Sequence, residues 1–178
     1  GGADFFGGLA ARRSSTLLTT AGVAIVGLVG LVIASVFVPA ISSADAWLYG
    51  GASGIAGAIG IGLLYGSLAI GPMSILSPAT AFISAIVPVS VGLYQGEGGE
   101  ASFFIALALA LVAIILVGFV PEKGALRPRP LGLLMAVGSG TSIGLTIVLI
   151  DRSPADSGLI PLLANRIVST TVLLACIA

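Results

Sequence analysis

Two charged residues in apolar segments are candidates for chemistry in this chain, and Asp4 is the more pointed of the two. Asp4 lies about two turns before Arg12-Arg13, and Arg166 follows Pro161 in a stretch with no other charge. A charge inside a bilayer is costly, which makes it a functional candidate by default. Asp4 could couple transport to protons, or lie at the interface if its helix ends early. Arg166 could bind an anionic group or extend to the lipid headgroups.

Uncharged polar residues form a second set of candidates. Ser77, Ser84 and Pro88 share one face of an expected helix, and a proline there leaves a carbonyl free to meet a ligand or a hydroxyl. Each serine could equally bond its own i−4 carbonyl, and Tyr65 could face a cavity or anchor at the interface. The candidates for a substrate cavity are Asp4, Tyr65, Ser74, Ser77, Thr80, Ser84 and Arg166, and the expected helix kinks are at Pro78 and Pro88.

Patterns that would indicate an enzyme are missing or out of context. Gly140-Thr-Ser142-Ile-Gly144 fits the hydrolase Gly-x-Ser-x-Gly motif, but that motif needs a strand–turn–helix and a histidine. The chain has no histidine, and its one cysteine, Cys176, cannot form a disulfide framework or a thiolate metal site by itself. No phosphate loop, zinc pattern or dinucleotide fingerprint occurs. We therefore expect no catalytic residues, no metal and no cofactor.

Composition places the chain in the membrane. Its 178 residues are 57% hydrophobic and 8% charged, whereas soluble domains carry about 25% charged residues. The formal net charge is zero, which argues against nucleic acid as a partner. The expected partners are the lipid bilayer and a small-molecule substrate, the expected location is the plasma (inner) membrane, and the sequence does not specify an oligomeric state.

Charges, glycines and prolines divide the sequence into membrane helices. Residues 46–96 hold no charge, which is too long for one crossing because about 20 residues span the hydrocarbon core. Gly71-Pro72 is typical of one helix ending and the next beginning. The expected helices cover 1–11, 16–37, 47–70, 72–94, 101–120 and 131–150, with a seventh starting near Ser157.

Small residues recur at every fourth position of the third expected helix, at Gly50, Gly54, Ala58, Gly62 and Gly66. Such a stripe lets a neighbouring backbone approach closely. It could also be a wall that leaves room for a substrate, and both interpretations can hold at different depths.

A weak internal repeat relates the two ends of the chain. Residues 1–7 align with residues 138–144 without gaps, and each copy precedes a charged break and another apolar helix. The copies are five helices apart, and an odd number of helices inverts the second unit in the membrane. We expect a first repeat over 1–120 with its first helix truncated, a polar linker over 121–130, and the start of a second repeat over 131–178. Both ends look cut, so we expect a piece of a longer protein.

Three stretches resemble the EamA-like branch of the drug/metabolite transporter superfamily. Gly2 to Arg13 is similar to that branch's first-helix ending, and Gly54 to Pro72 is similar to its third helix and turn. Ser77-Pro78, Pro88 and Gly96-Glu97 fall where its fourth helix carries them. The resemblance implies an all-α polytopic membrane protein of ten helices in two inverted five-helix repeats, with about six to seven helices present here. It also implies that Tyr65, Ser74, Ser77 and Thr80 line a central cavity.

The resulting hypothesis is a secondary transporter or facilitator that moves a small organic metabolite or drug by alternating access. The alternative is a membrane scaffold or assembly subunit without transport. Orientation stays open, because the family keeps its termini in the cytoplasm, whereas the arginines and lysine around 12–13 and 123–129 favour the opposite topology.

Overall fold

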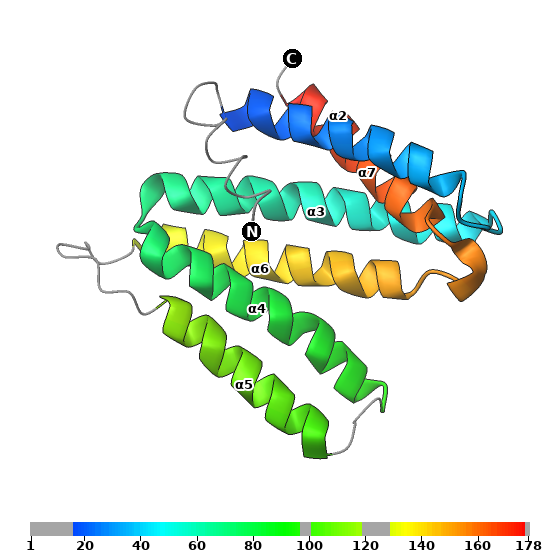
Figure 1. Cartoon of the computed structure of the whole chain (residues 1–178). Helices are drawn as coiled ribbons and strands as arrows, with labels where there is room; N and C mark the ends of the chain where they lie inside the picture. The colour runs from blue at the N-terminus through cyan, green and yellow to red at the C-terminus, as the bar shows by residue number, and fades with distance from the viewer. Residues whose placement is uncertain (1–15, 97–100, 119–128, 177–178) are drawn as a thin grey trace. The chain divides into compact units, whose positions relative to one another are not determined.

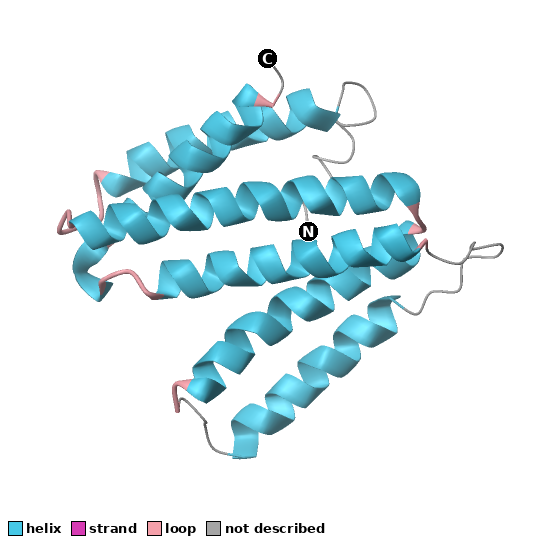
Figure 2. Ribbon diagram, turned by 180° about the vertical axis from the view of Figure 1, so that it is seen from behind, coloured by secondary structure: helices cyan, strands magenta, loops and turns pink. Residues whose placement is uncertain are grey.

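The computed structural model describes residues 16–96, 101–118 and 129–176. These residues form six α-helices and one 3₁₀ turn, and the described part of the chain contains no strand (Figures 1 and 2). The elements are α2 (Thr16–Ser35), α3 (Ala44–Ile70), α4 (Met73–Tyr94), α5 (Ala101–Gly118), α6 (Pro130–Asp151), η1 (Ala155–Ser157) and α7 (Ile160–Ala175). The all-α prediction is confirmed. The first expected helix lies outside the described residues, and the inverted repeat stays a prediction.

Helix boundaries fall close to those expected from the sequence, with one instructive difference. α3 begins at Ala44 and not at Trp47. The Ser43 hydroxyl accepts a hydrogen bond from the Ala46 N–H at 3.2 Å, so Ser43 caps the helix. Asp45 in the first turn also favours this start, because a carboxylate stabilises the positive end of the helix dipole.

Three helices are long and apolar enough to cross a membrane. They are α3, residues 75–94 of α4, and α6, with 27, 20 and 22 residues. At 1.5 Å rise per residue, about 20 residues span the ~30 Å hydrocarbon core. This is a membrane protein.

The chain divides into two compact units, each described by itself. Unit 1 comprises residues 1–58 and 149–178, and its described part holds α2, the first half of α3, η1 and α7. Unit 2 comprises residues 59–148, with the rest of α3, α4, α5 and most of α6. In unit 1, α2 lies beside α7, and in unit 2, α4 lies beside α5 (Figure 1). The predicted linker over 121–130 lies mostly outside the described residues, so the predicted repeat boundaries are untested.

The turn between α3 and α4 is as tight as the sequence predicts. Only Gly71 and Pro72 separate the helices, and the Pro72 carbonyl accepts the N–H groups of Ile75 and Leu76 at 3.2 and 3.1 Å. The Leu76 side chain is fully buried, and a Cβ on Gly71 would lie 2.6 Å from its Cδ1. Any larger residue at position 71 would have to move this buried side chain, which closes over the turn.

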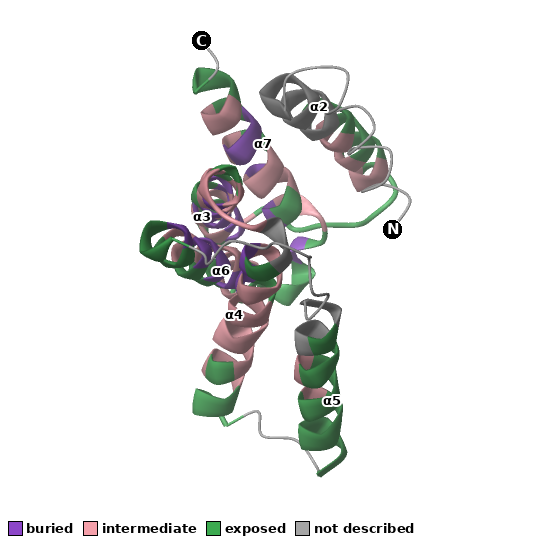
Figure 3. Ribbon diagram, turned by 90° about the vertical axis from the view of Figure 1, so that its left-hand side faces the viewer, coloured by how far each residue is buried: buried purple, intermediate pink, exposed green. Residues whose placement is uncertain are grey.

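The outer surface of α5 is apolar and exposed (Figure 3). Its exposed side chains include Ile105, Leu109 and Leu116. In water such a surface would promote aggregation, but it is the surface expected of a helix in contact with lipid.

Candidate functional site

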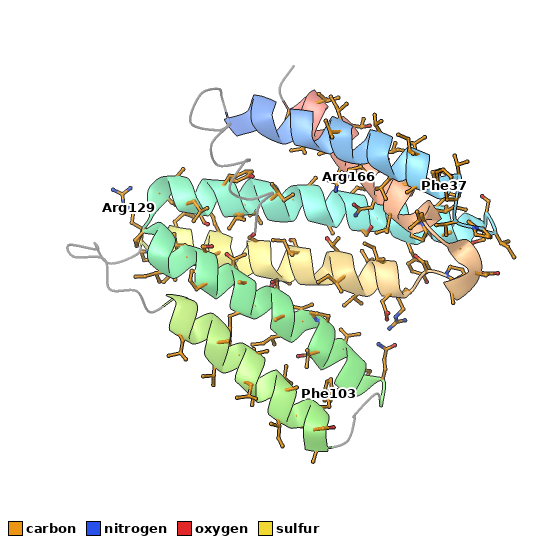
Figure 4. The ribbon with its side chains drawn as sticks, in the orientation of Figure 1. Phe37, Phe103, Arg129 and Arg166 are labelled. Carbon is orange, nitrogen blue, oxygen red and sulfur yellow. The ribbon has the colours of Figure 1, made fainter. Side chains whose placement is uncertain are left out.

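Arg166 differs from the other charged residues of the described chain. Asp45, Arg129, Asp151, Arg152 and Asp156 are all exposed. Arg166, in the seventh position of α7, is half-buried (Figure 4). Because a guanidinium has five donors and stays charged, its surroundings decide what it can bind.

The guanidinium of Arg166 lies against α2 at Gly27. A Cβ on Gly27 would be 3.5 Å from both Cζ and Nε of Arg166. A methyl group would just fit, whereas a larger side chain would take the place of the guanidinium. Within the described residues, no ion pair or hydrogen bond engages the Arg166 side chain.

Thr170 lies one turn beyond Arg166 on the same face of α7, because residues four apart in a helix are neighbours. It is 6% exposed, and its Oγ1 has no hydrogen-bond partner among the described residues. A buried hydroxyl left unpaired costs about 1–3 kcal/mol. Such groups are rare in native proteins and call for an explanation.

The opposite face of α7 is held against α3 by glycines. A Cβ on Gly50 would lie 2.5 Å from the Pro161 carbonyl oxygen, and one on Gly54 would lie 2.6 Å from that of Asn165. Asn165 Nδ2 also donates to Ser53 Oγ at 2.8 Å, and that hydroxyl donates to the Gly50 carbonyl at 2.7 Å. These contacts fix the rotation of α7 about its axis.

That rotation places Arg166 on the side of α2. Asn165 and Arg166 are consecutive, so their side chains diverge by about 100° around the helix. With Asn165 bonded to α3, Arg166 extends toward Gly27 of α2.

The loops that precede α3 and α7 are joined at one end of unit 1. The Ile41 N–H donates to the Asp156 carbonyl at 2.9 Å. Gly158 has a φ of +53°, a backbone conformation that favours glycine, and a Cβ there would lie 2.9 Å from the Pro39 carbonyl oxygen. This junction lies at the start of α7, about two turns from Arg166.

In unit 2, buried hydroxyls join helices. Thr80, 3% exposed, donates from Oγ1 toward the Leu76 carbonyl of its own helix at 3.0 Å and the Ala136 carbonyl of α6 at 3.3 Å. Ser139 of α6 donates to the Gly60 carbonyl of α3 at 2.7 Å. Thr80 thus contributes to the packing of α4 against α6, and its predicted place in a cavity stays a prediction.

The carbonyl freed by Pro88 meets a helix. Pro88 has no N–H for the Ser84 carbonyl, and a Cβ on Gly144 of α6 would lie 3.0 Å from that oxygen. One turn away, a Cβ on Gly140 would lie 2.7 Å from the Thr80 carbonyl oxygen. α4 continues as one helix through Pro78 and Pro88.

The other proposed cavity residues are not brought together by the described contacts. Ser84 donates to the Ala81 carbonyl of its own helix at 2.9 Å, Ser77 is half-buried, and Tyr65 is 41% exposed. Asp4 and the Ser74 side chain lie outside the described residues. A cavity role for Asp4, Tyr65, Ser74, Ser77 and Ser84 stays a prediction.

The glycine stripe of α3 does not form one continuous packing face. Gly50 and Gly54 contact α7, Gly66 lies against the Met135 side chain of α6, and a Cβ on Gly62 would have no described atom within 4 Å. The physical reason is that a four-residue step in a straight helix advances about 40° beyond a full turn, so the stripe winds around the helix. The space beside Gly62 holds no described atom, which is what the interpretation of the stripe as a wall with room for a substrate requires.

Several residues of these contacts are not named among the residues singled out from the sequence: Gly27, Gly60, Ser139 and Thr170. Gly27 and Ser139 give no local signal, because their partners are far along the chain. Thr170 could have been found from its spacing of four after Arg166.

No protein-family model, curated protein or solved structure matches this chain. The proposals below therefore rest on the residues, on the family resemblance that their motifs carry, and on the geometry.

Proposed function

We propose that this protein is a secondary transporter or facilitator that moves a small organic metabolite or drug across the plasma (inner) membrane by alternating access. The observation that carries the proposal is the half-buried guanidinium of Arg166 between α7 and Gly27 of α2, without a described acidic partner.

The cost of this charge is the physical argument. Arg166 is the seventh of 16 residues in the apolar helix α7, which is shorter than the three helices that are long enough to span. An arginine at the centre of a membrane helix costs about 2.5–3.5 kcal/mol even on the most lenient scale. Leucine in its place would avoid that cost, and a protein that only scaffolds others would gain nothing from the charge. A transporter needs a polar group at membrane depth that its solute can reach.

The similarity to EamA-like transporters supports the same proposal. On that basis the complete protein has ten helices in two inverted repeats, with the solute site between them. The open Gly62 and the exposed Tyr65 of α3 are further residues beside which a solute could pass.

Uptake by the intact protein in liposomes tests the proposal. Radiolabelled amino acids, nucleosides, sugars and monocarboxylates are offered to liposomes with wild type, Arg166→Gln or Arg129→Gln. Arg129 is the matched control because it is exposed at the start of α6. We expect saturable uptake of at least one solute, lowered at least tenfold by Arg166→Gln and unchanged by Arg129→Gln.

Uptake no higher than in empty liposomes for every solute would favour the scaffold instead. In that case Ser77→Leu or Gly62→Leu should alter association with a partner protein or folding.

Proton coupling through Asp4 has a separate test. If Asp4 carries the proton, Asp4→Asn abolishes uptake driven by a pH gradient while leaving solute exchange intact. Unchanged gradient-driven uptake would remove Asp4 from the mechanism.

A further inference from the structure

We propose that Arg166 and Thr170, with Gly27 opposite, form a binding subsite for a carboxylate group in unit 1. The inference rests on the proposed function, because the carboxylate is taken to belong to the transported solute. It narrows the substrate class from any small metabolite to monocarboxylates and amino acids.

The two donors are of the kinds from which a carboxylate accepts hydrogen bonds. A guanidinium offers two parallel N–H groups that match the two oxygens of a carboxylate. Thr170, one turn away on the same face, adds a hydroxyl that is buried and unpaired in the described structure. A bound carboxylate would pair both groups.

Gly27 lets the guanidinium lie close to α2. A Cβ on Gly27 would make an ordinary van der Waals contact with it, 3.5 Å from both Cζ and Nε, and a larger side chain would compete with the guanidinium for the same place. The Asn165–Ser53 hydrogen bond holds α7 so that Arg166 cannot turn to the α3 side without breaking it. The subsite is preorganised by contacts that do not involve the ligand.

Charge favours a carboxylate over a phosphate. Among α2, α7 and the first half of α3, Arg166 is the one cationic residue. A phosphate monoester carries about −1.5 to −2 charges at pH 7, and Arg166 alone would leave it partly uncompensated at membrane depth. A carboxylate carries one negative charge and is neutralised by one guanidinium.

Thermal unfolding of the intact protein in detergent, titrated with sodium propionate, measures this binding directly. Propionamide has the same shape without the charge and serves as the ligand control. A ligand that binds the folded state raises the unfolding temperature in proportion to its occupancy. We expect a saturable rise with propionate and none with propionamide.

Matched variants locate the site. Arg166→Gln should abolish the response, and Thr170→Val should weaken half-saturation about threefold to tenfold, as expected for one lost hydrogen bond. Gly27→Leu should abolish it by displacing the guanidinium. Gly30→Leu is its control, because Gly30 lies on the same helix, is exposed and has no described atom within 4 Å of a Cβ.

Equal responses to propionate and propionamide would overturn the inference, as would a response that survives in Arg166→Gln. A larger rise with inorganic phosphate than with propionate would overturn the choice of carboxylate. The binding measurement by thermal unfolding does not depend on the uptake of solute into liposomes. Uptake of neutral solutes without propionate binding would remove the subsite and leave the transporter, whereas propionate binding without any uptake would leave the subsite and remove the transporter.

Discussion

The helices of unit 2 and the α2–α7 pair of unit 1 use polar groups in opposite ways. In unit 2 the Thr80 and Ser139 hydroxyls each bond a carbonyl on another helix, and glycines such as Gly140 bring the backbones together. In unit 1 the Asn165–Ser53 pair does the same between α7 and α3. The α2 side of α7, however, presents a charge and a hydroxyl that no described residue pairs. Unit 2 shows polar groups used for packing, whereas the α2–α7 pair has polar groups without a described partner, and the proposed ligand site rests on them.

The largest expected effect is on the packing of unit 2. Gly140→Leu places a side chain where even a Cβ would be 2.7 Å from both the Thr80 carbonyl oxygen and Ile83 Cβ. We expect a loss of at least about 3 kcal/mol in the free energy of unfolding, at the upper end of overpacking costs, measured by denaturant titration in detergent micelles. Gly62→Leu is the control in the same unit and should be nearly neutral, because its position is open. Equal losses in both variants would contradict the described packing.

The second largest expected effect is an increase in the free energy of unfolding, caused by a substitution in unit 1. Arg166→Gln removes a half-buried charge, so we expect the free energy of unfolding to rise by about 1–3 kcal/mol. Thermal unfolding without added ligand checks this, with Arg129→Gln as the exposed control. A clear destabilisation would mean that Arg166 has a fixed acidic partner, and the contrast between the units would then disappear.

A smaller effect tests the hydroxyls of unit 2. Ser139→Ala removes the 2.7 Å hydrogen bond to the Gly60 carbonyl, and interhelical bonds of this kind average about 0.6 kcal/mol in membranes. We expect a loss of about 0.5–1 kcal/mol by the same denaturant titration. Thr141→Val is the control, because the exposed Thr141 bonds only the Val137 carbonyl of its own helix. A loss in Thr141→Val as large as in Ser139→Ala would remove the interhelical explanation.

The smallest expected effect is on the stability change caused by removing one atom, the Thr170 hydroxyl oxygen, compared with the same change at Thr80. Thr170→Val keeps the shape and removes a buried hydroxyl that no described residue pairs. We expect stability to stay level or rise by about 0.5–1 kcal/mol in the absence of ligand. The same change at the bonded Thr80 should lower stability. Loss of stability in Thr170→Val would show that its hydroxyl already has a partner.

The sequence could predict the helices because their signals are local. The charge-free run, the Gly71-Pro72 turn and the polar breaks each act within a few residues, and the observed boundaries follow them. The capping of α3 by Ser43 is also a local signal, although the sequence analysis did not use it.

Which faces meet could not be predicted in the same way. Packing between distant segments brings Gly27 to Arg166 and Gly60 to Ser139. The spacing of these residues along the chain gives no sign of the contacts. The even spacing of the α3 glycines suggested one face, and the 3.6-residue period of the helix distributes them over several. Arg166 could be named from sequence as a candidate, but the contact with Gly27 and the unpaired hydroxyl of Thr170, on which its proposed role rests, came from the structure.

The two-residue turn between α3 and α4 also bears on how unit 2 assembles. Closing a flexible loop carries an entropic cost that grows with its length, and Gly71-Pro72 leaves almost no loop to close. The short turn therefore keeps α4 close to α3, so that the effective concentration of one helix near the other is very high as soon as both are in the bilayer. Interhelical bonds of about 0.6 kcal/mol would be too weak to gather free helices. Here they need only fix the register of helices that the chain already holds together.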